Sequence, residues 1–284
     1  MSAAAPAAGD FESLSVSIDD GIAIVTLDRP ETRNVISDEP IVSELPAACA
    51  AFNADPSIRA VVLTGAGSAF SAGGNVRKML DREGMFAGSP AEIAAAYRSG
   101  IQTLIRAVHG LAMPSVAAVN GPAIGAGFDL ALACDLRLAA RTAKFGETFV
   151  TLGLVAGDGG SWLLPRVVGE QRAAELAFTG RVIDADEAVR LGVVLDVYDA
   201  DALLPAALDL ARTIASQPGL ATRYTKRLLR NAQTGSFDEV LDAAAEMQAE
   251  LHGTAEHLAA VQALIDRQQA AKRQRAQQPN SGRT

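Results

Sequence analysis

Short apolar runs rich in β-branched residues recur along this chain, and each ends in a glycine or proline turn. Such runs are typical of buried strands. A segment with helical character follows each of them. The runs are IAIVTL at 22–27, RAVVLTG at 59–65 and SVAAVNG at 115–121, and the predicted helices cover 39–54, 90–109 and about 125–134. The repetition of strand, glycine loop and helix predicts an α/β fold.

The second half of the chain adds two strands and then becomes helical throughout. LRLAA at 136–140, with the segment to Phe145, predicts a strand, and VVLDVY at 193–198 predicts the last one. Short helices are expected over 157–190. The later helices are expected at 201–215, 218–231, 236–251 and 254–272. We therefore predict a loose tail at 1–10, an α/β core over 11–200, a helical region over 201–272 and a polar tail at 273–284, with Asp38 as the N-cap of the first helix.

Composition excludes several classes of protein. The 284 residues are 49% hydrophobic, which is enough for a sizeable core, and the net charge of -8 argues against a sequence-independent nucleic-acid binder. No uninterrupted apolar stretch of about 20 residues predicts a membrane span. The N-terminus lacks the basic start and apolar core of a signal peptide. Cys49 and Cys134 are expected to be buried thiols, so a reducing, cytoplasmic location is expected.

Two glycine loops end neighbouring predicted strands. One is FSAGGN at 70–75, and the other is GPAIGAG at 121–127, which leads into a helix. The first amides of a helix have no partner in the helix, and glycine lets a ligand approach the backbone closely. Two such loops could therefore each direct one N–H at a single oxygen, as an oxyanion hole does. The alternative is that both are ordinary tight turns. Neither matches a phosphate-binding motif.

Three acidic residues stand among glycines and apolar residues: Asp129, Glu147 and Asp158. Burial raises the pKa of a carboxyl group and prepares it for proton transfer near neutral pH. Two alternatives remain open: Asp129 could simply complement a helix dipole, and Asp158 could cap the helix that holds Trp162. No cluster of Cys and His supports a metal site, and no histidine partner for Ser71 supports a hydrolase triad.

Four ordered segments resemble one known family, the crotonase or enoyl-CoA hydratase/isomerase superfamily. They are VTLDRPETRNVIS, VVLTGAGSAFSAGGNVRKM, PSVAAVNGPAIGAGFDLALACDLRLAARTAKFG and LGLVAGDGGSWLLPRVVG, within a resemblance that runs from about residue 12 to about 270. The resemblance implies a crotonase-like spiral of β-β-α units. It also implies a helical C-terminal region that forms trimers, often stacked as hexamers. Members bind acyl-CoA thioesters and stabilise an enolate with two backbone amides.

The resemblance assigns roles to positions of this chain. It implies that the amides of Gly74 and Ala126 form the oxyanion hole and that Asp129 is the main acid/base, with Glu147 or Asp158 as its partner. It places contacts to coenzyme A near Arg33, Val35, Gly73 and Arg77, where the two arginines would face phosphates or be merely solvated. Coenzyme A is then part of the substrate, and no separate cofactor or metal is implied.

One departure from the family pattern bears on the reaction. Hydratases carry a second catalytic glutamate three positions after the FG pair, and this chain has Phe149 there. The expected function is hydration or double-bond isomerisation of an enoyl-CoA through an enolate. The alternatives are a non-catalytic acyl-CoA binder of the same fold, or a thioester hydrolase or decarboxylase. We expect a homotrimer or hexamer with no nucleic-acid or membrane partner.

Overall fold

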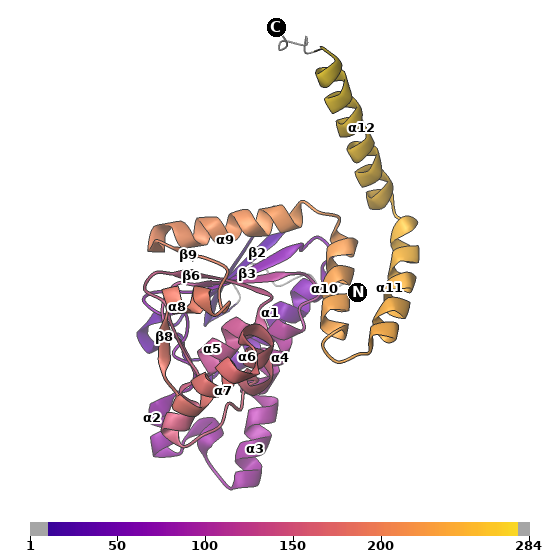
Figure 1. The fold of residues 1–284 in the computed structure, drawn as a ribbon. Helices are drawn as coiled ribbons and strands as arrows, with labels where there is room; N and C mark the ends of the chain where they lie inside the picture. The colour runs from indigo at the N-terminus through magenta and orange to yellow at the C-terminus, as the bar shows by residue number, and fades with distance from the viewer. Residues whose placement is uncertain (1–10, 278–284) are drawn as a thin grey trace. The chain divides into compact units, whose positions relative to one another are not determined.

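The computed structural model describes residues 11–277 (Figure 1). The tail predicted at 1–10 lies outside these residues. Part of the tail predicted at 273–284 belongs to the last helix, which continues to Gln277, and the remainder is outside the described range. The chain divides into two compact units, one that ends at Ala215 and one that begins at Ser216. The predicted boundary at residue 200 falls before a helix that packs on the sheet of the first unit.

Two sheets form the framework of the first unit. The larger has the strand order β1-β2-β3-β4-β6-β9, in which β1 is antiparallel to β2 and the other neighbours are parallel. The smaller has the order β5-β7-β8. The strands of the larger sheet are β1 (Leu14–Asp19), β2 (Ile22–Leu27), β3 (Ala60–Gly65), β4 (Ser115–Val119), β6 (Leu136–Ala140) and β9 (Val197–Tyr198), and those of the smaller are β5 (Ala123–Ile124), β7 (Lys144–Gly146) and β8 (Val182–Asp184).

The predicted α/β fold is confirmed. The structure has strands that were not predicted, and one predicted strand is two separate strands. The central strands β3 and β4 are buried at every residue, which explains their unbroken apolar runs. β1 was not predicted, although the alternation in LSVSID is typical of an edge strand with one exposed face. The strand predicted to run through Phe145 is divided into β6 and β7 in separate sheets, and the last strand is only two residues long.

Helices cover the first unit and make up most of the second. In the first unit they are α1 (Ile41–Ala54), α2 (Val76–Asp81), α3 (Pro90–Ser99), α4 (Ile101–His109), α5 (Ala126–Ala133), α6 (Gly160–Val168), α7 (Glu170–Thr179), α8 (Ala185–Arg190) and α9 (Ala200–Ala215), with 3-10 turns η1 (Pro30–Thr32), η2 (Gly84–Phe86) and η3 (Thr148–Leu152). In the second they are α10 (Gly219–Asn231), α11 (Phe237–His252) and α12 (Ala255–Gln277). None of the described helices is long and apolar enough to cross a membrane.

Two helix predictions are wrong in detail. Asp38 does not cap α1, because that helix begins after Pro40, and the Asp38 carboxylate instead accepts a hydrogen bond from Asn75 and pairs with Lys78 at 3.1 Å. The helix predicted over 90–109 is two helices that meet at Gly100, whose backbone has left the helical region. The apolar period continued across that glycine, so the pattern alone could not reveal the break.

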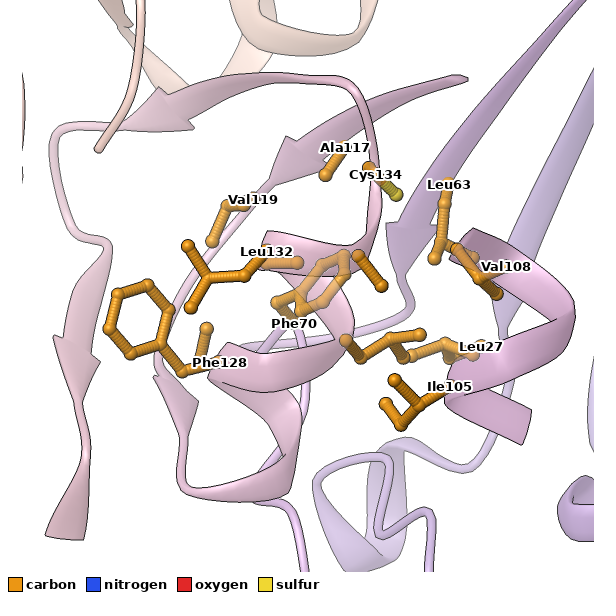
Figure 2. Close-up of a cluster of buried hydrophobic side chains, with 14 of the residues drawn as sticks. Leu27, Leu63, Phe70, Ile105, Val108, Ala117, Val119, Phe128, Leu132 and Cys134 are labelled. Atoms are coloured by element: carbon orange, nitrogen blue, oxygen red, sulfur yellow. The ribbon is translucent and has the colours of Figure 1, made fainter. Parts of the chain in front are cut away.

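Each face of the large sheet is covered by its own apolar cluster. On one face, Phe70 lies among side chains of α4, α5 and the central strands (Figure 2). On the other face, α9 crosses β3, β4 and β6 and buries Leu203, Ala207 and Ala211 (Figure 1). The eight residues of α5 are all buried, so this short helix lies inside the molecule and its first turn is fixed by the packing around it.

Candidate active site

The two glycine loops meet at the ends of β3 and β4. Ser71 forms a bridge with Ala123, and Gly73 forms one with Val35. A β-carbon added at Gly73 would lie 3.1 Å from the amide nitrogen of Ala126 and closer still to the carbonyl oxygen of Ile124. Gly73 also has a φ of +80°, which a residue with a side chain rarely adopts. Glycine at this position is therefore what lets the two loops touch.

The amides of Gly74 and Ala126 are the two donors of the predicted oxyanion hole. Ala126 is the first residue of α5, and Gly125 before it turns the chain with a φ of +53°. Within residues 11–277, neither amide donates a hydrogen bond to a protein acceptor. Unpartnered amides at a helix start favour a negatively charged oxygen. The structure brings these two loops together, as the sequence predicts.

Asp129 lies one turn into α5 and is fully buried. Its Oδ2 accepts a hydrogen bond of 3.0 Å from the amide of Gly160, the first residue of α6. Its Oδ1 receives no hydrogen bond from the described residues. Asp129 is therefore held by one helix and oriented by a second, and one of its oxygens remains available for another proton donor or for a substrate.

Glu147 approaches Asp129 across Gly160. A β-carbon on Gly160 would collide with both Oδ1 of Asp129 and Oε1 of Glu147. Glu147 is 2% exposed, and neither of its oxygens receives a hydrogen bond from an N–H or hydroxyl group in the described chain. The two carboxyl groups are therefore neighbours in an apolar setting, where a shared proton would satisfy one oxygen of each.

Burial sets the ionisation of these acids. It raises the pKa of Asp129 well above its ordinary value, and the charge of Glu147 raises it further. Burial likewise raises the pKa of Glu147. Burial, followed by the charge of Asp129, raises the pKa of Asp158 to about 7. Three carboxyl groups with raised pKa values in one place are suited to proton transfer near neutral pH.

The structure decides between the two readings of Asp158. Gly159 is the N-cap of α6, so Asp158 is not the capping residue of that helix. Asp158 is 4% exposed, and its Oδ1 has no hydrogen-bond partner. The helix-cap alternative is therefore excluded for this geometry. The dipole alternative for Asp129 is not excluded, although its carboxylate accepts a hydrogen bond from Gly160, the first residue of α6, rather than from the amides that begin its own helix.

Phe149 lies in η3 and is half-buried. Its ring carbon Cζ is 3.6 Å from the point where a β-carbon of Gly125 would lie. An apolar ring therefore adjoins the loop that carries the Ala126 amide. This is the position at which the family resemblance places a second glutamate.

The structure brings together only some of the residues predicted to contact coenzyme A. Val35 and Gly73 are paired, and the amide of Ala72 donates to the carbonyl of Arg33 at 2.8 Å. The side chain of Arg33 is exposed, and its backbone is left-handed with a φ of +56°. Arg77 is exposed in the first turn of α2. The backbones of Arg33 and Val35 adjoin the oxyanion loop, by which we mean residues 70–75 with the Gly74 amide, while both arginines are exposed to solvent.

Sequence reasoning missed Gly160, Phe86 and Tyr97. Gly160 could have been noticed as the last glycine of the GDGG segment, although nothing in the pattern says what it approaches. Tyr97 lies beside Gly157, where a β-carbon would be 3.2 Å from its ring, and the charge of Asp158 contributes to its raised pKa after burial. No local pattern marks the two aromatic residues.

A pocket of about 230 Å³ lies between α6 and α7. Glu147 and Gly160 line it, together with apolar residues that include Leu164 and Ala173. No group of three or more His, Cys, Asp or Glu side chains in residues 11–277 is arranged to hold a metal ion. The polar chemistry of the site therefore consists of two backbone amides and three buried carboxyl groups.

A mostly parallel sheet wrapped by short helices, with two unpartnered amides on adjoining loops and a buried acid nearby, is the arrangement that the sequence resemblance predicts for an α/β enzyme. The family model described as enoyl-CoA hydratase/isomerase matches residues 17–275. The chain belongs to the enoyl-CoA hydratase/isomerase family, the crotonase superfamily, and is an acyl-CoA enzyme of that type.

Relatives and solved structures agree with this assignment. The chain is 36% identical over 232 residues to the 1,2-epoxyphenylacetyl-CoA isomerase of Escherichia coli K12, covering 82% of this chain and 87% of that protein. It is 33% identical over 237 residues to the crotonyl-CoA hydratase of Syntrophomonas wolfei, covering 83% and 88%. The crystal structure of an enoyl-CoA hydratase from Bacillus anthracis superposes with a TM-score of 0.84 at 31% identity, covering 90% of this chain and 97% of that one.

Proposed function

We propose that this protein moves the double bond of an enoyl-CoA through an enolate, with Asp129 as the proton carrier. The observation that carries the proposal is the buried Asp129 carboxyl group, three residues after the unpartnered amide of Ala126. A thioester oxygen bound to the amides of Gly74 and Ala126 would place its acyl carbons toward this acid. As the enolate forms, both amides would stabilise the negative charge on the oxygen.

The proton balance of this step is simple. The Asp129 carboxylate removes a proton from one carbon of the acyl group, and the electron pair is delocalised into the thioester as an enolate. Protonated Asp129 then returns the proton to another carbon, and the double bond moves between them. Burial raises the pKa of Asp129, which favours holding the proton during the life of the enolate.

Phe149 supports isomerisation over hydration. Hydration needs a positioned water molecule and a proton for the α-carbon, and the Phe149 ring can neither activate water nor donate a proton. The ring adjoins Gly125 and so occupies space next to the loop that carries the Ala126 amide. A missing general acid or base typically costs ~10²–10⁴-fold in rate. We therefore expect slow hydration compared with isomerisation.

Asp129→Asn tests the proposal, because it keeps the size of the side chain and removes its proton chemistry. Isomerisation of a 3-enoyl-CoA should fall by roughly 10²–10⁴-fold, while the dissociation constant for coenzyme A stays nearly unchanged. Reactions in heavy water, followed by mass spectrometry, would distinguish a moved double bond from added water. Rapid turnover by the Asn variant would show that Asp129 is not the proton carrier.

Hydration is the second candidate, and Glu147 is the observation that favours it. Its carboxyl group approaches Asp129 across Gly160, so the site does hold two neighbouring acids. In this case Glu147→Gln should abolish addition of water to a 2-enoyl-CoA. If isomerisation alone occurs, Glu147→Gln should alter its pH dependence and leave no hydration to lose.

The binding of coenzyme A is also a proposal. We assign its backbone contacts to Val35 and Gly73, which are paired beside the oxyanion loop, and its phosphate contacts to Arg33 and Arg77. Coenzyme A enters as part of the substrate, and the chemistry above requires no further cofactor. Replacing both arginines by Gln should weaken binding of coenzyme A and make it less sensitive to salt.

Assembly as a homotrimer or hexamer and a cytoplasmic location complete the proposal. Large apolar side chains are exposed on the second unit, including Leu229, Phe237, Leu241 and Leu258. An exposed set of this kind supports association with further copies of the chain. The location rests on the cysteine content, since Cys49 and Cys134 are buried thiols.

A further inference from the structure

Three aromatic rings lie against the glycines that frame the active site. Aromatic residues make up only 5% of the chain, so three rings against three glycines of these loops are unusual. Phe86 has its Cζ 4.0 Å from the point where a β-carbon of Gly74 would lie, and Phe149 is similarly close to Gly125. Tyr97 lies beside Gly157, the residue before Asp158. The rings therefore lie beside the Gly74 amide, the start of α5 and the loop that carries Asp158.

Phe86 and Tyr97 form a continuous wall. Their centroids are 6.5 Å apart and their planes are inclined by 70°, which is an edge-to-face arrangement. Phe86 ends η2, and Tyr97 lies in α3, a helix held at its start by the reciprocal Ser89 and Glu92 cap. The pair thus connects the neighbourhood of the Gly74 amide with that of Asp158, on the two sides of the site.

Core packing accounts for only part of the surface of these rings, because Tyr97 and Phe149 lie at the edge of the core cluster. The aromatic side chains of the core, Phe70, Phe128 and Phe145, are fully buried. Phe86, Tyr97 and Phe149 are each half-buried, so part of each ring is left uncovered by the protein. A half-buried ring close to a catalytic amide can contact the group that the amide binds.

We propose that the acyl group bound at this site carries an aromatic ring, so that the substrate class is an arylacyl-CoA thioester. The proposal rests on the proposed function, which places the thioester oxygen on the amides of Gly74 and Ala126. From that oxygen the acyl group extends toward Asp129, between Phe149 and the wall formed by Phe86 and Tyr97. Edge-to-face and offset contacts between aromatic rings favour an aryl group over a chain of equal carbon count, by roughly 2- to 12-fold per contact.

Binding without turnover gives the direct test. The ligands are 3-phenylpropanoyl-CoA and nonanoyl-CoA, which have equal numbers of acyl carbons and no reactive double bond. Calorimetry with the full chain should give a dissociation constant roughly tenfold lower for the aryl ligand. Phe86→Leu and Tyr97→Leu should each reduce this preference several-fold, since leucine keeps an apolar side chain and removes the ring.

Matched variants distinguish the effect of removing an aromatic ring at the site from the general effects of a substitution. Tyr97→Phe keeps the ring and should keep the preference, which also covers the case in which Tyr97→Leu fails to fold. Phe237→Leu removes an exposed ring in the second unit and should leave the preference for the aryl ligand unchanged. Phe178 lines the pocket between α6 and α7, so a preference that responds to Phe178→Leu and not to Phe86→Leu would overturn the proposal.

The outcomes also separate this proposal from the proposed function. Equal affinity for the two ligands, together with turnover of an enoyl-CoA that depends on Asp129, would overturn the aryl preference alone. Failure of both ligands to bind any more tightly than coenzyme A would overturn both proposals, because the site would then not hold an acyl group.

Discussion

At the scale of single residues, Gly160 is the point at which the acids of the site are brought together. Its amide donates to Asp129, and its missing side chain leaves room for both Asp129 and Glu147. We expect Gly160→Ala to displace these carboxyl groups and to lower turnover by roughly 10²-fold, which is the cost of a misplacement of about 1 Å. Steady-state kinetics on an enoyl-CoA measures the loss.

Gly253→Ala is the matched control for that substitution. A β-carbon there would have an ordinary contact of 3.4 Å with the carbonyl of Glu250, and the backbone is already helical. It should leave turnover unchanged. Equal activity of the Gly160→Ala and control variants would mean that the two acids do not need the space at Gly160.

The raised pKa of Asp158 predicts how the free energy of unfolding depends on pH. Burial raises its pKa in the folded protein to about 7, from an ordinary 3.8, so the folded state binds its proton more tightly than the unfolded state does. The stability due to this proton is complete below pH 3.8 and is lost as pH rises to about 7. This loss of folding free energy over the whole pH interval corresponds to roughly 4 kcal/mol at most.

Asp158→Asn removes this dependence, because an amide does not ionise. The free energy of unfolding of the variant relative to wild type should therefore increase between about pH 4 and pH 7 and then become constant. Urea unfolding at several pH values measures it, with the exposed Asp81→Asn as control. If the difference in free energy of unfolding between the variant and the wild type does not change with pH over this interval, burial does not raise the pKa of Asp158.

At the scale of elements, the packing of α9 on one face of the larger sheet depends on small, buried side chains. Ala207 and Ala211 are fully buried where this helix crosses the strands. Because there is no space for a larger side chain, Ala207→Leu should destabilise the fold by about 1–3 kcal/mol. Ala202→Leu, at an exposed position of the same helix, should have little effect, and thermal unfolding compares the two. Equal melting temperatures would show that α9 is loosely packed.

At the scale of the whole molecule, exposed apolar residues on the second unit predict self-association. Leu241 and Leu258 are 51% and 64% exposed. We expect light scattering at micromolar concentration to give the mass of three or six chains. Leu241→Glu with Leu258→Glu should shift the mass toward one chain, because an unpaired carboxylate is costly to bury. A wild-type protein that is monomeric under these conditions would contradict the prediction.

Some of the site could be predicted because it is local in the sequence. Ala126 and Asp129 lie on consecutive turns of one short helix, so the glycine loop before them already places an amide and an acid together. The strand runs that end in glycine loops likewise predicted the α/β framework, because fully buried strands are apolar at every position. These features depend on a few neighbouring residues.

Other features depend on contacts between distant segments. Glu147 and Asp158 come from different loops. Only the folded chain shows that Glu147 approaches Asp129 across Gly160 and that the charge of Asp129 acts on Asp158. The capping role predicted for Asp38 was wrong, because Asn75 and Lys78 bind its carboxylate from another part of the chain. The aromatic wall of Phe86 and Tyr97 has no local pattern at all.

By itself, the sequence determined the alternation of strands and helices, the two glycine loops and the residues able to donate or carry a proton. These follow from backbone freedom and from the periodicity of apolar residues, which act over a few positions. The tertiary structure alone decided which acids are neighbours, how far burial raises their pKa values and which rings adjoin the amides. Desolvation and proximity are properties of the packed chain, and no stretch of sequence contains them.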